Sequence, residues 1–218
     1  MKQKTVFIVA LVALVFLFLV GSLLYNAKPA NEAPQMSDAR RAALVRMHSP
    51  SLGKSDAPVV IVEFLDPACE TCAAFYPMVK ELMAANPNQI RVVLRYAPFH
   101  KGSDKVVAVL EAARKQGKFW QVLEALLVRQ SAWAPHHTAQ VDLVWPLLEG
   151  LGLDMNKLRA DAGAPEIANV IAQDLEDART LNVTKTPEFF VNGRPLPSFG
   201  FEQLKALVNT AIGETRRQ

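Results

Sequence analysis

The run Val59–Leu65 is the feature that most constrains the fold. Its residues (VVIVEFL) are β-branched or apolar apart from one acid, a composition typical of a buried strand. The turn DPACETC follows directly, and apolar residues then recur at helical spacing until Asn86 and Pro87. Ile90–Tyr96 (IRVVLRY) predicts a second strand, which the handedness of crossover connections places parallel to the first. The sequence therefore predicts a βαβ unit and an α/β fold.

The chain from residue 97 to residue 184 shows helical patterns and no convincing strand, so we interpret it as a helical insertion. The patterns cover Val106–Gln116, Phe119–Arg129, Val141–Leu151 and Ile167–Leu181. After the insertion, Glu188–Val191, the turn Asn192-Gly193 and a return strand from Arg194 predict a β-hairpin. Phe201–Ile212 predicts an amphipathic helix that closes the domain.

The N-terminus contains an apolar run without charge, Thr5–Leu24, which as a helix reaches about 30 Å and can span a bilayer. Lys2 and Lys4 before it favour a cytosolic N-terminus, which sends the rest of the chain across the membrane. A cleaved signal peptide is the alternative, but its apolar region is usually only about 7 to 15 residues long. We therefore expect a single uncleaved anchor in a bacterial cytoplasmic (inner) membrane, with the folded domain on the periplasmic side.

Five segments are expected along the chain. Residues 25–52 are polar and carry prolines, which indicates a linker, and Asp38–Met47 within them could form a short helix. The predicted segments are a cytosolic N-terminus (1–4), a transmembrane anchor (5–24), the linker (25–52), the folded domain (53–213) and a tail (214–218).

The charge pattern argues against nucleic acid as a partner. Lys2, Lys4 and Lys28 account for the whole formal net charge of +3, so the remaining acidic and basic residues balance. No basic cluster with interleaved aromatic residues occurs in the body of the chain, and such a cluster is what nucleic-acid binding requires.

The two cysteines, Cys69 and Cys72, are the only ones in the chain and lie three positions apart. A bridge that closes so short a loop stabilises a fold little, because it restricts the unfolded chain little. A zinc site needs about four ligands, and the four histidines show no ligand spacing, so no metal site is predicted. The pair is therefore expected to be reactive.

The position of the pair at the start of a helix assigns the two thiols different roles. A helix N-terminus lowers a thiol's pKa, so Cys69 is the expected nucleophile. Cys72, one turn into the helix, would resolve the mixed disulfide by attacking the sulfur of Cys69. Glu63 stands on the otherwise apolar strand, where a charge is costly to bury without a partner or a function. A solvent-facing position is the alternative for Glu63, since strand periodicity allows it.

From about residue 53 to residue 212, the order βαβ, helical insertion, β-hairpin, helix resembles the DsbA-like branch of the thioredoxin superfamily. The resemblance rests on Cys69-Glu70-Thr71-Cys72, on Glu63, on Thr186-Pro187 before EFFVNG, and on the final hairpin and helix. It implies a thioredoxin-like fold with an inserted helical domain. It also implies that Glu63 accepts the proton of Cys72, and that Thr186 and Pro187 form a cis-proline loop that faces the cysteines and binds substrate backbone.

Two departures from that family leave the direction of electron flow open. Glu70 and Thr71 stand where strong oxidants of this branch carry Pro-His, and a carboxylate beside Cys69 is expected to raise its pKa and weaken the oxidising power. Thr186 before the proline resembles isomerases and reductases, whereas the strongest oxidases have valine there.

The expected function is that of a membrane-anchored, extracytoplasmic thiol-disulfide oxidoreductase. Its expected partners are protein thiols and disulfides and a membrane redox partner. No cofactor is expected, because no dinucleotide-binding glycine pattern occurs. Two alternatives stay open: a copper-handling module that uses the two thiolates, and an adaptor whose thioredoxin fold only docks partners.

Overall fold

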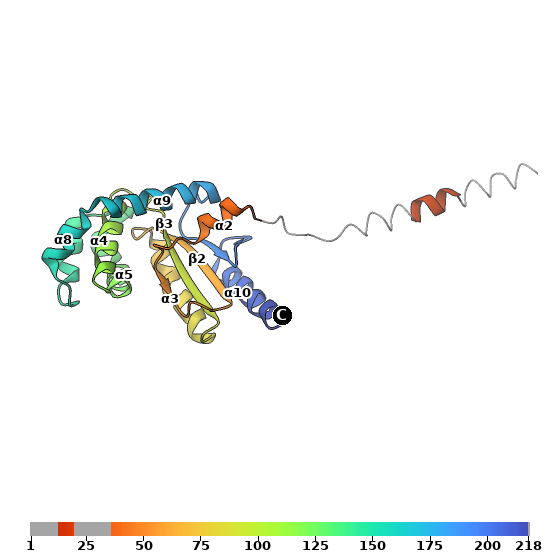
Figure 1. The fold of residues 1–218 in the computed structure, drawn as a ribbon, viewed down its shortest axis with the longest axis horizontal. Coiled ribbons are helices and arrows are strands. Elements are labelled where there is room, and N and C mark those ends of the chain that lie inside the picture. The colour runs from red at the N-terminus through yellow and green to blue at the C-terminus, as the bar shows by residue number, and fades with distance from the viewer. Residues whose placement is uncertain (1–12, 20–35, 218) are drawn as a thin grey trace, which may run out of the picture. The chain divides into compact units, whose positions relative to one another are not determined.

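A five-stranded sheet of order β1-β3-β2-β4-β5 forms the centre of the fold (Figure 1). The computed structural model describes residues 13–19 and 36–217. The strands are β1 (Ser51–Leu52), β2 (Val59–Leu65), β3 (Ile90–Tyr96), β4 (Glu188–Val191) and β5 (Arg194–Pro195). β2 and β3 are parallel and β4 and β5 form an antiparallel hairpin, so both predicted strand arrangements are confirmed. β1 pairs antiparallel with β3 and was not predicted, since two residues are too short to show a period.

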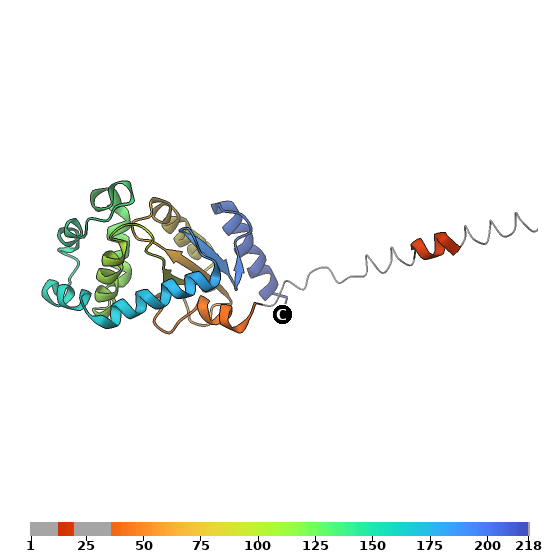
Figure 2. The ribbon, with the colours of Figure 1, turned by 90° about the horizontal axis from the view of Figure 1, so that it is seen from above.

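Helices cover both faces of the sheet (Figures 1 and 2). On one face, α3 (Glu70–Ala85) and α10 (Phe201–Thr215) bury a cluster with strand residues that include Ile61 and Phe189. On the other, α9 (Pro165–Leu181) packs against β3. Because successive strand residues point to opposite faces, β2 and β3 are apolar almost throughout.

The region between β3 and β4 is helical, as predicted. It contains α4 (Ser103–Lys115), α5 (Phe119–Val128), α6 (Gln130–Trp133), η1 (Pro135–His137), α7 (Val141–Val144), η2 (Trp145–Leu148), α8 (Met155–Ala162) and α9. The single helix expected over Val141–Leu151 is wrong in part: α7 ends at Val144 and a 3-10 turn follows, with Pro146 lacking the N–H that an α-helix would need. The sequence also missed α8, which Asp154 caps by accepting from the Lys157 N–H at 3.0 Å.

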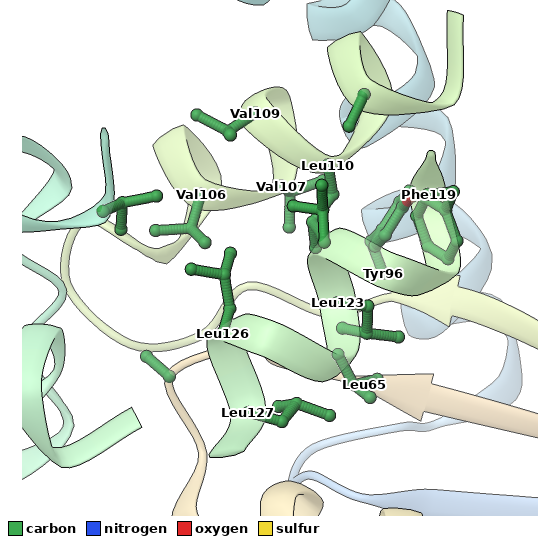
Figure 3. Close-up of a cluster of buried hydrophobic side chains, with 14 of the residues drawn as sticks. Leu65, Tyr96, Val106, Val107, Val109, Leu110, Phe119, Leu123, Leu126 and Leu127 are labelled. Carbon is green, nitrogen blue, oxygen red and sulfur yellow. The ribbon is translucent and has the colours of Figure 1, made fainter. Parts of the chain in front are cut away.

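A second apolar cluster joins the helical insertion to the sheet (Figure 3). Leu65 and Tyr96, at the ends of the two parallel strands, meet side chains of α4 and α5. Those side chains include Val106, Val107, Leu110, Leu123 and Leu126. Cys69 and Cys72 belong to the same cluster, so the insertion forms part of their surroundings.

The folded unit begins at Ser37, within the range that the sequence assigns to the linker. The short helix considered there is present as α2 (Asp38–Leu44), with Ser37 as its N-cap. Arg40 donates to the carbonyl of Thr180 at 3.0 Å, so α2 is hydrogen-bonded to the end of α9. This contact joins residues far apart in sequence and cannot be read from composition.

The N-terminal part is described only over residues 13–19, which are helical. The large apolar side chains of this segment, Leu14 to Leu19, are exposed. The predicted anchor, residues 5–24, falls mostly outside the described residues. Within residues 13–19 and 36–217, no helix has both the length and the apolar character needed to cross a membrane.

A buried ion cluster attaches α9 to the sheet. Arg95 of β3 is fully buried and its guanidinium contacts Asp174 at 2.7 Å and Asp177 at 2.6 Å. Asp174 also accepts from the backbone N–H of Tyr96 at 2.8 Å, and Asp177 binds Arg46 through two hydrogen bonds. The cluster therefore joins the sheet, α9 and the segment after α2 in one network.

We expect Asp174→Ala to destabilise the fold by about 3 to 5 kcal/mol, because it leaves the buried Arg95 without one of its carboxylates. Urea unfolding followed by circular dichroism measures this change. Glu176→Ala on the same helix removes an exposed pair with Arg179 and should change stability by about 0.5 kcal/mol or less. Equal effects of the two substitutions would contradict the role given to the cluster.

Candidate active site

The cysteine pair lies where β2 ends and α3 begins. Cys69 is the N-cap residue of α3, and its backbone N–H donates to the carbonyl of Asp66 at 3.0 Å. The buried Asp66 carboxylate accepts from the Ala68 N–H at 2.8 Å and from the hydroxyl of Ser103. The hydrogen bonds of the buried Asp66 carboxylate thus hold the Asp-Pro turn, and this turn places Cys69 at the N-terminus of α3.

Cys69 has the properties expected of a nucleophile. Its pKa is lowered to about 5, chiefly by a hydrogen bond with the Cys72 thiol. A hydrogen bond with the Thr186 side chain and the backbone N–H groups of Thr71 and Cys72 add to this effect, while burial opposes it. These groups stabilise the thiolate, as the position at a helix N-terminus predicts.

Cys72 is fully buried and its pKa is raised well above the ordinary value. Burial is the largest cause, followed by the hydrogen bond to Cys69 and the charge of Glu63. Both cysteines are free thiols in this structure. One thiol is thus stabilised as an anion and the other as a neutral group, an asymmetry that suits a nucleophile and a resolving thiol.

Glu63 is buried, at 1% exposure, which excludes the solvent-facing alternative. Its pKa is raised to about 8, first by burial and then by the charge of Cys69. Its Oε1 is buried without a hydrogen-bond partner in the part of the chain that the structure describes. A buried carboxyl that titrates close to neutral pH can take up or release a proton beside Cys72.

The Thr186–Pro187 peptide bond is cis, as predicted. The Cys69 thiol donates to the carbonyl oxygen of Thr186 at 3.3 Å, so the proline loop lies directly against the nucleophile. The fold brings these residues together although 117 positions separate them in sequence.

The pKa of Cys69 is lowered in spite of the neighbouring Glu70, whose carboxylate is expected to raise it, and Glu70 is not among the causes of the shift. Glu70 is exposed on the first turn of α3, where water screens its charge, while hydrogen bonds act directly on the sulfur. Thr71 contributes through its backbone N–H.

Gln130 was missed by the sequence reasoning. This buried residue of the insertion donates from Nε2 to the carbonyls of Pro67 and Cys69, at 2.7 and 2.9 Å. His100 was also missed; its backbone N–H and its Nδ1 both contact the Asp66 carboxylate. No spacing in the sequence indicates either residue, because both reach the turn from separate elements.

Two thiols are the metal-binding groups that the described site presents. Residues 13–19 and 36–217 contain no group of three or more His, Cys, Asp or Glu side chains placed to hold one. The arrangement supports attack by a thiolate, formation of a mixed disulfide and its resolution by a neighbouring thiol.

Comparison with known proteins gives one family match and several similar structures. The family model described as Thioredoxin matches residues 46–210. A thioredoxin-like oxidoreductase from Silicibacter pomeroyi is 32% identical, with a TM-score of 0.67 over 78% of this chain and 96% of that one. Alpha-DsbA1 from Wolbachia pipientis, at 17% identity, has a TM-score of 0.70 over 81% of this chain and 96% of that one. At such low identity the second likeness shows the fold alone.

Curated relatives are much longer than this chain. The Na(+)/H(+) antiporter NhaA 3 of Salinispora tropica is 34% identical over 75% of this chain, but this is only 25% of the antiporter. The antiporter NhaA of Herminiimonas arsenicoxydans is 30% identical over the whole chain and 34% of its own length. The chain thus spans a quarter to a third of these relatives.

The family model covers most of the chain, including both cysteines, the proline loop and the helices of the insertion. The fold and the pair of unlike thiols agree with that match. The chain therefore belongs to the thioredoxin family.

Proposed function

We propose that this protein is a disulfide donor to extracytoplasmic protein thiols. The observation that carries the proposal is the pKa of about 5 at Cys69. A stabilised thiolate exists only in the reduced pair, so it favours the reduced form over the disulfide and makes the pair a stronger oxidant. A pKa below pH 7 stabilises the reduced form at neutral pH and so raises the reduction potential of the pair.

The reaction proposed is a two-step exchange. A substrate thiolate attacks Cys69 in the Cys69–Cys72 disulfide, a mixed disulfide forms, and Cys72 leaves. A second substrate thiolate then attacks the substrate sulfur of the mixed disulfide and releases Cys69 as its thiolate. The substrate loses two electrons and two protons and gains a disulfide, while the enzyme becomes a dithiol. A membrane redox partner would take up the two electrons and restore the enzyme disulfide.

Glu63 is proposed as the proton donor and acceptor for Cys72. The departing Cys72 thiolate is buried and disfavoured, so it needs a proton. Glu63, with a pKa of about 8, is mostly protonated at pH 7 and can supply that proton. In the reverse direction the same carboxylate accepts the proton of Cys72. Thr186 and Pro187 are proposed to pair with the substrate backbone beside Cys69, because the Thr186 carbonyl contacts the sulfur.

The chain is proposed to be held at the outer face of a bacterial cytoplasmic membrane by residues 5–24. The apolar, charge-free run and the exposed apolar side chains of the helical residues 13–19 support this. The two lysines before the run support an orientation with the folded unit outside the cytoplasm.

The function is tested by the reduction potential of the pair, measured by equilibration with glutathione and trapping of the thiols. We expect a value between about −120 and −200 mV, and catalysis of disulfide formation in a reduced, unfolded protein. Cys69→Ser should abolish that catalysis. A value near about −270 mV, which is typical of thioredoxin, would instead indicate a reductant.

The same protein gives a second check through the ultraviolet absorbance of the thiolate. The thiolate absorbance of Cys69 should rise with a midpoint near pH 5. A midpoint at the ordinary cysteine value of about 8.5 would remove the basis of the proposal. Absence of any redox cycling, together with tight Cu(I) binding, would favour a copper-handling module.

We expect Glu63→Gln to slow reduction of the enzyme disulfide by a dithiol peptide about a hundredfold or more, the range of general acid-base catalysis. In the wild type, the rate corrected for ionisation of the peptide thiols should fall as the pH rises through the pKa of Glu63, which burial raises. The variant should lack this decrease. Glu81→Gln, exposed on α3, is the matched control. A decrease that persists in Glu63→Gln would assign the titration to another group.

Anchoring is tested by fractionation of cells that express the whole chain. The protein should stay with membranes after alkaline carbonate washing, and protease added outside the cytoplasmic membrane should digest it. A fragment from Asn31 onward should be released. A mature protein whose mass lacks the N-terminal segment would show instead that a signal peptide is removed.

A further inference from the structure

The buried Asp66 carboxylate, three residues before Cys69, is held by four donors. Its Oδ1 accepts from the Ala68 N–H at 2.8 Å and from the Ser103 hydroxyl. Its Oδ2 accepts from the backbone N–H of His100 at 2.8 Å and lies 2.7 Å from Nδ1 of the same residue. An ionised carboxylate can only accept, so Nδ1 carries a proton in this contact. His100 thus supplies both hydrogen bonds of one carboxylate oxygen.

The backbone of Asp66 meets both cysteines. Its carbonyl accepts from the Cys69 N–H at 3.0 Å. Its own N–H forms a hydrogen bond with the Cys72 thiol, which lowers the pKa of Cys72 although burial raises that pKa more. The orientation of Asp66 therefore decides whether the buried sulfur of Cys72 has this backbone donor.

His100 holds Asp66 from the surface of the fold. It lies in the loop between β3 and α4, and its side chain is 29% exposed, whereas Asp66 and Ser103 are buried. Its ring stacks on the ring of His137 in η1, with centroids 4.9 Å apart and planes 21° from parallel. The imidazole is thus stacked through its face on the insertion and bonded through its edge to the active-site turn.

We propose that His100 is a positioning residue for the exchange reaction, because it holds Asp66 with its backbone N–H directed at the sulfur of Cys72. This rests on the proposed function, in which an attacking thiolate bonds to Cys69, the Cys69–Cys72 bond breaks, and Cys72 leaves with the electron pair and takes a proton from Glu63. The free thiols of this structure are the product of that step, so the contact is present where the negative charge arrives.

The effect on the rate follows from the leaving group. A hydrogen bond to a thiolate lowers the pKa of the thiol, and a thiol of lower pKa leaves faster in disulfide exchange. Loss of the bond between His100 and Asp66 frees the carboxylate to turn, and the N–H of Asp66 then no longer meets the departing sulfur. His100 acts through Asp66 and therefore affects the departure of Cys72 rather than the attack on Cys69.

The test measures reduction of the oxidised full-length protein in detergent by dithiothreitol, followed by trapping of the thiols. We expect His100→Ala, which removes the Nδ1 donor, to be reduced about three- to tenfold more slowly. His100→Asn keeps a side-chain N–H the same number of bonds from the backbone and should recover most of the rate. His136→Asn is the matched control, because it replaces an exposed histidine of η1 at a left-handed φ that asparagine tolerates. It should keep the wild-type rate.

Alkylation of the reduced protein by iodoacetamide separates positioning from a general loss of structure. This reaction uses the thiolate of Cys69 and does not require Cys72 to leave. The alkylation rate of His100→Ala should therefore stay within about twofold of the wild-type rate. An equal loss of both rates, an unchanged reduction rate in His100→Ala, or a His100→Asn variant as slow as His100→Ala would overturn the proposal.

Dithiothreitol also separates this proposal from the proposed function, because it reduces the pair whether or not protein thiols are substrates. Slow reduction of His100→Ala, in a protein whose wild type does not oxidise a reduced, unfolded protein, would support the positioning role and reject the disulfide donor. Oxidation of that substrate by the wild type, with equal reduction rates for wild type and His100→Ala, would do the reverse.

Discussion

The buried guanidinium of Arg95 is the contact on which the arrangement of the site depends. It is enclosed between β3 and α9 and holds two carboxylates, Asp174 and Asp177. Helix α9 ends at Leu181, and Asn182 follows as a left-handed C-cap residue that turns the chain towards the proline loop. A shift of α9 on the sheet would therefore move Thr186 relative to Cys69. A shift that separated Arg95 from its carboxylates would leave a buried charge unpaired, so the ion cluster opposes movement of α9 along the sheet.

The pKa values of the two thiols shift in opposite directions because the thiols differ in burial and in their neighbouring hydrogen bonds and charges. Cys69, at the helix N-terminus, receives hydrogen bonds that stabilise its anion in spite of burial. Cys72 lies deeper, meets the charge of Glu63 and keeps its proton. Glu63 itself is buried on β2, so its pKa is raised and the two groups can share protons near neutral pH. Burial raises the pKa at both sulfurs, and only at Cys69 do hydrogen bonds outweigh it.

Local patterns in the sequence were sufficient for much of this fold and for the core of the site. The run Val59–Leu65, the cysteine spacing and the Thr186-Pro187 pair each carry a signal within a few residues, and the predicted βαβ unit and cis bond are confirmed. The missed features depend on distant partners. β1 exists only as an addition to β3, and Gln130 reaches the active-site turn from the insertion.

The helical insertion contributes to the site more directly than an appended domain would. Its apolar core continues into both cysteines, and Gln130 holds the carbonyls of the reactive turn. Its α5 also supplies one wall of a groove whose other wall is α3, with Ala73 and Val128 among the lining residues. In a domain without the insertion, that face of α3 would lack its neighbour and the groove would not exist. The insertion therefore supports the reactive turn through the Gln130 hydrogen bonds and shapes the surface next to it.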